Sequence, residues 1–172
     1  MRVLGLMVAG VVLCTACSDG ATQESKDLDA LRRATESYQD TSVANIAGWT
    51  ATLTPCMTSP DSSGAMGVHF GNPALIGDSG KLNIERPEIL IYEPSPFGRK
   101  LVGVEYVVPY TFRSRESDPP SLFGQQFQRF DDFNLWGLHV WAYRDNPSGL
   151  FAPWNPDVSC GPGAHAMPMN GD

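Results

Sequence analysis

The sequence lacks the local motifs that most often mark a catalytic or nucleotide-binding site. No serine lies in GxSxG, no two histidines are spaced as HxH or HExxH, and neither Cys56 nor Cys160 lies in a CxxC cluster. The glycine-rich segment GAMGVHFG (64–71) is not followed by the lysine and helix of a phosphate-binding loop. Serine-nucleophile catalysis and phosphate-loop chemistry are therefore unsupported, and a functional site would have to be assembled from residues far apart in the chain.

Basic residues are also scarce, with 12 Lys and Arg against 19 Asp and Glu. The basic residues form no stripe or cluster along the chain. Because binding to nucleic acid depends on phosphate contacts from such a stripe, we expect no nucleic-acid partner. The same scarcity argues against direct electrostatic attraction to anionic lipid.

The chain has no apolar run long enough to cross a membrane, which takes about 20 residues. Its one long apolar run, residues 3–13, follows Arg2 and precedes small residues. This layout is typical of a signal peptide, which we assign to residues 1–16. The segment CTAC (14–17) resembles a bacterial lipobox, with Cys17 as the lipidated first residue of the mature protein. It departs from that pattern at Cys14, where leucine is usual, and the alternative is cleavage and secretion without a lipid.

The lipobox interpretation predicts that Cys17→Ala releases the protein from membranes into the soluble fraction. Diacylglycerol and an acyl chain bury many methylenes, each worth about 0.8 kcal/mol, so their loss removes a stable anchor. Fractionation of cells that produce each form measures the effect. A variant that still sediments with the membrane contradicts lipid attachment at Cys17.

Only four cysteines are present. Cys14 lies in the signal peptide, and Cys17 is the expected site of lipid attachment. The remaining two, Cys56 and Cys160, are expected to form a disulfide in an oxidising compartment. A closed loop of about 100 residues would stabilise the fold by on the order of 4 to 5 kcal/mol in the chain-entropy model. The alternative is a pair of thiol metal ligands, which is less favourable because neither of these two cysteines lies in a CxxC cluster.

The rest of the chain predicts one α+β domain over residues 27–160, after a tether at 17–26 and before a flexible tail at 161–172. A helix of about 20 residues is expected from Asp27, which can cap its first turn, to a stop at Gly48. Glycine and proline then punctuate short apolar segments, which predicts a curved antiparallel sheet with long loops. The expected strands are 50–54, 66–70, 88–93, 100–108 and 137–144, with a long irregular connection at 113–134.

The segment 94–99 reads as the turn of a hairpin that pairs Glu93 with Lys100. Regular alternation then predicts two faces. One face is expected to be core and carries Ile89, Ile91, Val102, Val104, Tyr106 and Val108. The other is mixed and carries Glu88, Leu90, Tyr92, Leu101, Gly103, Glu105 and Val107.

Several segments together resemble a family of exported bacterial proteins whose activity is uncharacterised. They are PC (55–56), GAMGVHFGNPALIGD (64–78), PEILIYEP (87–94), LVGVEYVVP (101–109), PSLFGQQF (120–127) and LHVWAYRDNPSGLFAPWNPDVSC (138–160). The resemblance spans the mature domain from the first helix to Cys160. It implies an exported domain with these limits, and no activity, cofactor or catalytic residue.

A metal site is the first functional hypothesis. His69, Glu105 and His139 are imidazole and carboxylate ligands on three expected strands, which a sheet can bring together. In the alternative interpretation, the histidines donate to backbone carbonyls or lie at the rim of the sheet. The tail offers a weaker site for copper(I), made of His165, Met167 and Met169.

Two further hypotheses use other residues. Glu88 and Glu105 are expected to be cross-strand neighbours, and such a pair of carboxylates could catalyse glycoside hydrolysis. Without a site that holds one of them protonated, the two glutamates would only repel each other. An aromatic set could line a pocket for a small ligand or could simply be core. That set comprises Trp136, Trp141, Tyr143 and Trp154, with Phe151, Pro153 and Pro156 nearby. The sequence therefore favours an exported binding or accessory protein, with a metal-binding protein or metal-dependent enzyme as the alternative.

Overall fold

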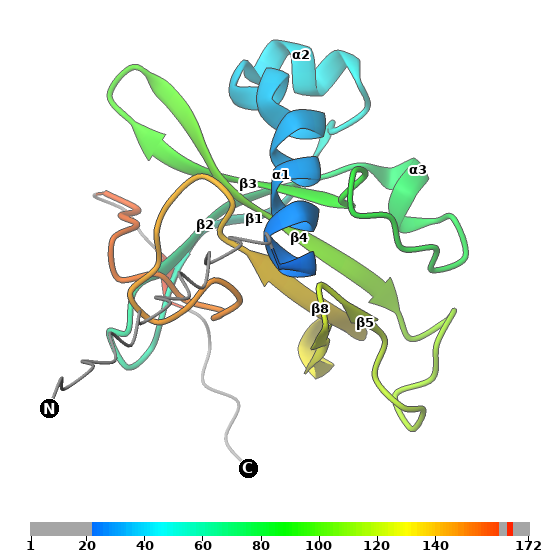
Figure 1. The fold of residues 1–172 in the computed structure, drawn as a ribbon. Coiled ribbons are helices and arrows are strands. Elements are labelled where there is room, and N and C mark those ends of the chain that lie inside the picture. The colour runs from blue at the N-terminus through cyan, green and yellow to red at the C-terminus, as the bar shows by residue number, and fades with distance from the viewer. Residues whose placement is uncertain (1–21, 162–164, 167–172) are drawn as a thin grey trace, which may run out of the picture.

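The computed structural model describes residues 22–161 and 165–166 (Figure 1). The expected signal peptide, Cys17, Met167 and Met169 lie outside these residues. None of the helices within the described ranges has the length and apolarity needed to cross a membrane.

The N-terminal helical segment starts earlier than expected and is broken. α1 (Gln23–Thr35) begins four residues before Asp27, because the Thr22 side chain caps it by accepting from the Ser25 backbone N–H. The 3₁₀ helix η1 (Glu36–Gln39) and the short α2 (Thr41–Ile46) follow. Asp40 between them is extended and caps α2, which ends the expected continuous helix.

The sheet confirms the predicted α+β class. Six antiparallel strands run in the order β7-β8-β4-β3-β2-β1, and β9 (His165–Ala166) adds to β1 in parallel. The six are β1 (Ala51–Thr58), β2 (Ala65–Gly71), β3 (Ile89–Ser95), β4 (Gly98–Pro109), β7 (Gln128–Phe130) and β8 (Leu135–Val140). The short α3 (Pro73–Ile76) follows β2.

The expected irregular connection at 113–134 contains regular structure. It holds the separate hairpin of β5 (Ser121–Leu122) and β6 (Gln125–Gln126), then β7 and the 3₁₀ helix η2 (Asp131–Phe133). The last expected strand was placed too far along the chain, since β8 ends at Val140. Short pairings such as these depend on the neighbouring strand rather than on local periodicity.

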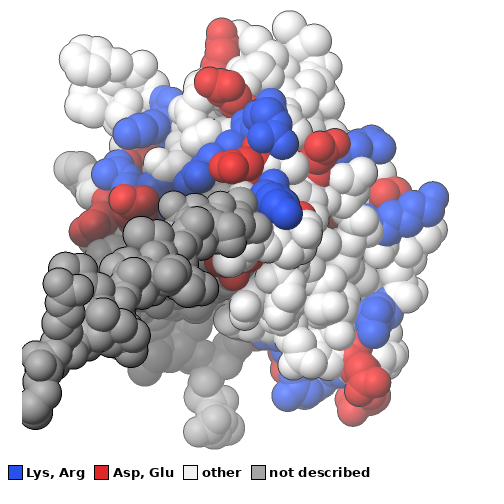
Figure 2. Space-filling model, in the orientation of Figure 1, with Lys and Arg blue, Asp and Glu red and all other residues white. Residues whose placement is uncertain are grey.

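One face of the sheet packs against α1 and forms the larger core (Figure 1). Leu31 of α1 and Trp49 are buried there with Tyr92 and Tyr106. The Arg32 side chain donates to the Ala142 carbonyl at 2.7 Å and ties the helix to the chain after β8. On the side shown in Figure 2, acidic and basic side chains are interspersed, and the described residues there form no extended region of one charge.

A bulge corrects the predicted faces of the β3–β4 hairpin. Glu93 does pair with Lys100, but Tyr92 pairs with Leu101 and Ile91 with Gly103, so Val102 is an extra residue in β4. From Gly103 onward, each β4 side chain therefore lies on the opposite side from the prediction, relative to the side chains of β3. Leu90, Val104, Tyr106 and Val108 therefore face α1, whereas Ile89 and Ile91 share the opposite face with Glu105.

The sheet curls toward this opposite face. In a flat sheet β1 and β7 would lie about 24 Å apart, since neighbouring strands are about 4.8 Å apart. Instead, Leu53 of β1 and Phe130 of β7 line the same cavity. The curl brings together side chains from strands at both ends of the antiparallel order.

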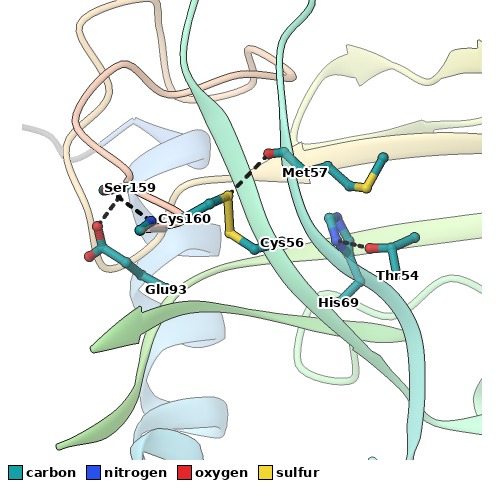
Figure 3. The surroundings of a disulfide bond; sticks show 8 residues. Thr54, Cys56, Met57, His69, Glu93, Ser159 and Cys160 are labelled. Carbon is teal, nitrogen blue, oxygen red and sulfur yellow. Dashed lines mark hydrogen bonds between the residues drawn. A yellow bond between two sulfur atoms is a disulfide. The ribbon is translucent and has the colours of Figure 1, made fainter. Parts of the chain in front are cut away.

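A disulfide joins Cys56 of β1 to Cys160, as the cysteine count predicts (Figure 3). It closes a span of 104 residues and holds the C-terminal segment against β1. The Glu93 carboxylate accepts from the Ser159 backbone N–H at 2.9 Å and also pairs with Arg144. These contacts place the end of the domain beside the strand that carries Thr54 and Met57.

Candidate metal centre

β2 and an irregular segment of β1 position the first side chain of the site. His69 lies within β2 and is only 4% exposed. Its partner in β1 is Thr54, whose Oγ1 lies 2.9 Å from Nδ1 of His69 (Figure 3). The β1–β2 register shifts between Thr54 and Met57, around Pro55, so that both line one cavity. In a regular strand two residues three apart would face opposite sides.

β4 and β8 supply the other two side chains as direct cross-strand partners. Glu105 and His139 pair across these strands and are 6% and 3% exposed. Gly137 lies two residues before His139 and so faces the same side. A Cβ there would lie 2.8 Å from Glu105 Oε1 and 2.7 Å from the Phe130 ring. The missing side chain at Gly137 therefore makes room for the carboxylate and for the aromatic wall beside it.

The three side chains converge although their strands are not all neighbours. His69 and Glu105 are separated by β3, so their backbones are about 10 Å apart. Their side chains reach over β3 and bring His69 Nε2 to 3.6 Å from Glu105 Oε2 and 3.4 Å from His139 Nε2. His139 Nδ1 lies 3.8 Å from Glu105 Oε1. One ligand atom from each residue fits within a 4.8 Å separation.

These separations suit a metal ion better than a set of hydrogen bonds. Good hydrogen bonds join heavy atoms at about 2.7 to 3.2 Å. A tetrahedral zinc ion with bonds of about 2.0 to 2.1 Å holds its ligand atoms about 3.3 to 3.4 Å apart. The distances of 3.4 and 3.6 Å from His69 Nε2 lie near the second value.

Burial keeps all three groups in their neutral forms. It lowers the pKa of His69 to about 4, opposed by a hydrogen bond with the Gly67 backbone, and together with the nearby His69 it lowers the pKa of His139 to about 3. Burial also raises the pKa of Glu105 to about 8, and Glu88 adds to this rise. At neutral pH both imidazoles are unprotonated, as metal ligands must be, and the proton on Glu105 is the one that a cation would displace.

Thr54 orients His69 for this role. When Nδ1 carries the imidazole proton and donates it to Thr54 Oγ1, Nε2 presents its lone pair toward His139 and Glu105. A partner that holds the other ring nitrogen in this way is the usual support of a metal-binding histidine.

The cluster borders a small, apolar cavity of about 70 Å³. Apart from the three clustered residues and Thr54, the described side chains that line it are apolar: Leu53, Met57, Met66, Ile89, Phe130, Phe133 and Leu135. Pockets for drug-sized ligands have volumes of about 300 to 1,000 Å³. This cavity therefore suits an ion and a ligand of a few atoms.

None of the aromatic residues expected to form a pocket lines this cavity. Trp136 is buried in the core against α1, and Trp141 is buried on the opposite face, where it stacks near His139. The Tyr143 hydroxyl contacts Arg32 and Thr35 of α1. Trp154 lies in the loop after β8, where its carbonyl accepts from the Asn146 side chain. Trp136 and Trp141 serve as core on opposite faces of the sheet.

The carboxylates of Glu88 and Glu105 are not the cross-strand neighbours that the sequence predicts. Glu105 pairs with Ile89 rather than standing opposite Glu88, because the bulge shifts the register. The Glu88 carboxylate accepts from the Val107 backbone N–H at 3.1 Å and does not line the cavity. In the tail, the backbone of His165 pairs with Met57, while the two methionines lie outside the described residues.

Sequence reasoning identified the three ionisable residues and missed those that support them. The roles of Thr54 and Gly137 depend on which residues pair across the strands, and the sequence does not show this pairing directly. Met57 reaches the cavity through the register shift in β1, and Phe130 reaches it through the curl of the sheet. Pro55 directly follows the expected strand 50–54, and a proline at that place is a sign that a longer strand would be irregular there.

Comparison with known proteins returns no match among family models, curated proteins or solved structures. The fold and the cluster therefore define the class of protein. It is an α+β domain with a curled antiparallel sheet that carries a buried group of two histidines and one glutamate.

Proposed function

We propose that this protein is an exported, lipid-anchored domain that binds one divalent transition-metal ion through His69, Glu105 and His139. The observation that carries the proposal is the convergence of two imidazole nitrogens and one carboxylate oxygen within 4.8 Å on one face of the sheet. Export is supported by the leader, by the lipobox-like CTAC and by the resemblance to exported bacterial proteins. The Cys56–Cys160 disulfide suits an oxidising compartment.

The donor set favours some metals over others. Imidazole suits zinc, copper, iron and nickel, whereas magnesium and calcium prefer oxygen ligands. Two neutral imidazoles and one carboxylate match the three-ligand sets of zinc sites. Zinc and copper are accordingly the ions to test first.

The competing interpretation is a metal-free polar cluster held by hydrogen bonds. The separations of 3.6 and 3.8 Å between Glu105 and the histidines are too long for good hydrogen bonds. A buried carboxyl group without close partners costs free energy, which a bound cation would offset. The geometry therefore favours the metal site.

Calorimetric titration of the chelator-stripped protein with zinc or copper tests the proposal. We expect one ion per chain with at least micromolar affinity, and loss of that binding in His69→Ala and in His139→Ala. Circular dichroism of each variant checks that it is folded. Absence of micromolar binding in the parent protein, or binding that survives both substitutions, contradicts the site.

A further inference from the structure

The three ligand residues leave one side of a bound ion uncovered. All three extend from the same face of one sheet, on β2, β4 and β8. All three also border the 70 Å³ cavity, which lies on that face. An ion held by them would have the sheet on one side and the cavity on the other.

The cavity offers no obvious fourth ligand with a charge. Of the described residues that line it, Glu105 is the only acidic one and none is Lys or Arg. Glu88, the other buried carboxyl group of this region, accepts from the Val107 backbone N–H and lies outside the lining. Structural zinc sites are usually closed by four protein ligands, whereas catalytic sites keep an open position.

The net charge of the site with a bound metal ion determines which kind of further ligand the ion would take. A divalent ion bound to two neutral imidazoles and one carboxylate carries a net charge of about +1. That charge would lie among apolar side chains, where an uncompensated charge is costly. A monoanion in the remaining position would neutralise it.

The size of the cavity limits that ligand. On the scale at which one water needs about 10 to 15 Å³, the cavity holds on the order of five water-sized groups. Leu53 and Phe133 are its two most exposed lining residues, at 45% and 47%, and therefore form its mouth. Both are bulky and apolar, so the entrance favours small ligands.

We propose that the bound ion keeps a coordination position open to this cavity, and that this position takes a small monoanion of a few non-hydrogen atoms. The inference rests on the proposed metal site and makes it a reactive site rather than a structural one. Hydroxide belongs to this ligand class, because zinc lowers the pKa of a bound water to about 7 as the water gives its proton to solvent.

The test uses the full-length protein loaded with cobalt(II), whose visible absorption reports on its coordination. Azide serves as the small monoanion. We expect azide to shift the cobalt bands along a saturable curve, with one azide per ion. If cobalt is bound in a one-to-one ratio and azide leaves the spectrum unchanged, the position is closed and the inference is wrong. Failure to bind cobalt, zinc or copper at all would instead overturn the metal site itself.

A larger ligand tests the mouth. Imidazole should leave the spectrum of the parent protein unchanged and should shift it in Phe133→Ala, where the entrance is wider. The matched control is Phe112→Ala, which removes a phenyl ring of similar exposure that does not line the cavity. A shift of equal size in the parent protein, or in both variants, contradicts the size limit.

Discussion

Glu105→Gln is expected to weaken zinc binding by at least about 100-fold. Loss of a residue that only supports a metal ligand typically costs about 10- to 100-fold in affinity, and Glu105 is a proposed ligand itself. The substitution keeps the shape of the side chain but removes the only acidic group, and so the only group able to supply a negative charge to the ion, among the described residues that line the cavity. Competition with a chromophoric chelator measures affinities over this range.

Glu88→Gln is the matched control for this experiment. Glu88 is buried like Glu105, and burial raises its pKa to about 8 as well, although hydrogen bonds with the backbone of Val107 and Glu88 oppose the rise. Its carboxylate lies outside the cavity, so its replacement should leave zinc affinity nearly unchanged. Equal losses of zinc affinity in both variants would mean that the effect comes from a general disturbance of the fold. Unchanged affinity in Glu105→Gln would mean that the Glu105 carboxylate is not a ligand.

The stability of the metal-free protein is expected to fall steeply as the pH rises from about 6.5 to 8. The folded-state pKa values of Glu88 and Glu105 are raised to about 8. In this window the unfolded chain has already released both protons and the folded chain retains them. Each group then lowers the free energy of unfolding by about 1.4 kcal/mol per pH unit.

The histidines produce the opposite trend at lower pH. Their pKa values are lowered to about 4 for His69 and about 3 for His139, so the unfolded state binds more protons between those values and about 6.5. Their contribution to stability therefore rises with pH and offsets that of the two carboxyl groups between about pH 4.5 and 6.5. We expect a plateau in that range.

Urea unfolding at a series of pH values measures this profile. Bound zinc should reduce the slope between about pH 6.5 and 8 by about half, because Glu105 is then ionised in the folded state. Glu105→Gln should reduce it by the same amount without metal. A flat profile in the metal-free parent would show that the carboxyl groups are not held protonated.

The α+β class and most of the strands could be read from the sequence because they depend on local patterns. Glycine and proline punctuate short apolar segments, and Glu93 and Lys100 flank a recognisable turn. The helix was less predictable, since Thr22 and Asp40 cap it at positions that periodicity does not reveal. Capping depends on single side-chain hydrogen bonds, and several nearby residues were able to provide them.

The sequence could not show which residues of β3 and β4 share a face, because one extra residue in β4 reverses the alternation of its side chains relative to β3. The bulge at Val102 moved Ile89 and Ile91 away from Val104 and placed them beside Glu105. Its location depends on how β4 fits between β3 and β8, which is a property of the whole sheet.

For the site, residue chemistry alone identified His69, Glu105 and His139 as candidate ligands, and the cysteine count identified the disulfide. The convergence of these three side chains depends on the strand order β2-β3-β4-β8 and on the curl of the sheet around the cavity. Thr54 and Gly137, which orient and accommodate the ligands, became visible only in the folded chain. Ligand chemistry belongs to individual residues and can be read along the chain, whereas distances between strands arise only when the sheet forms.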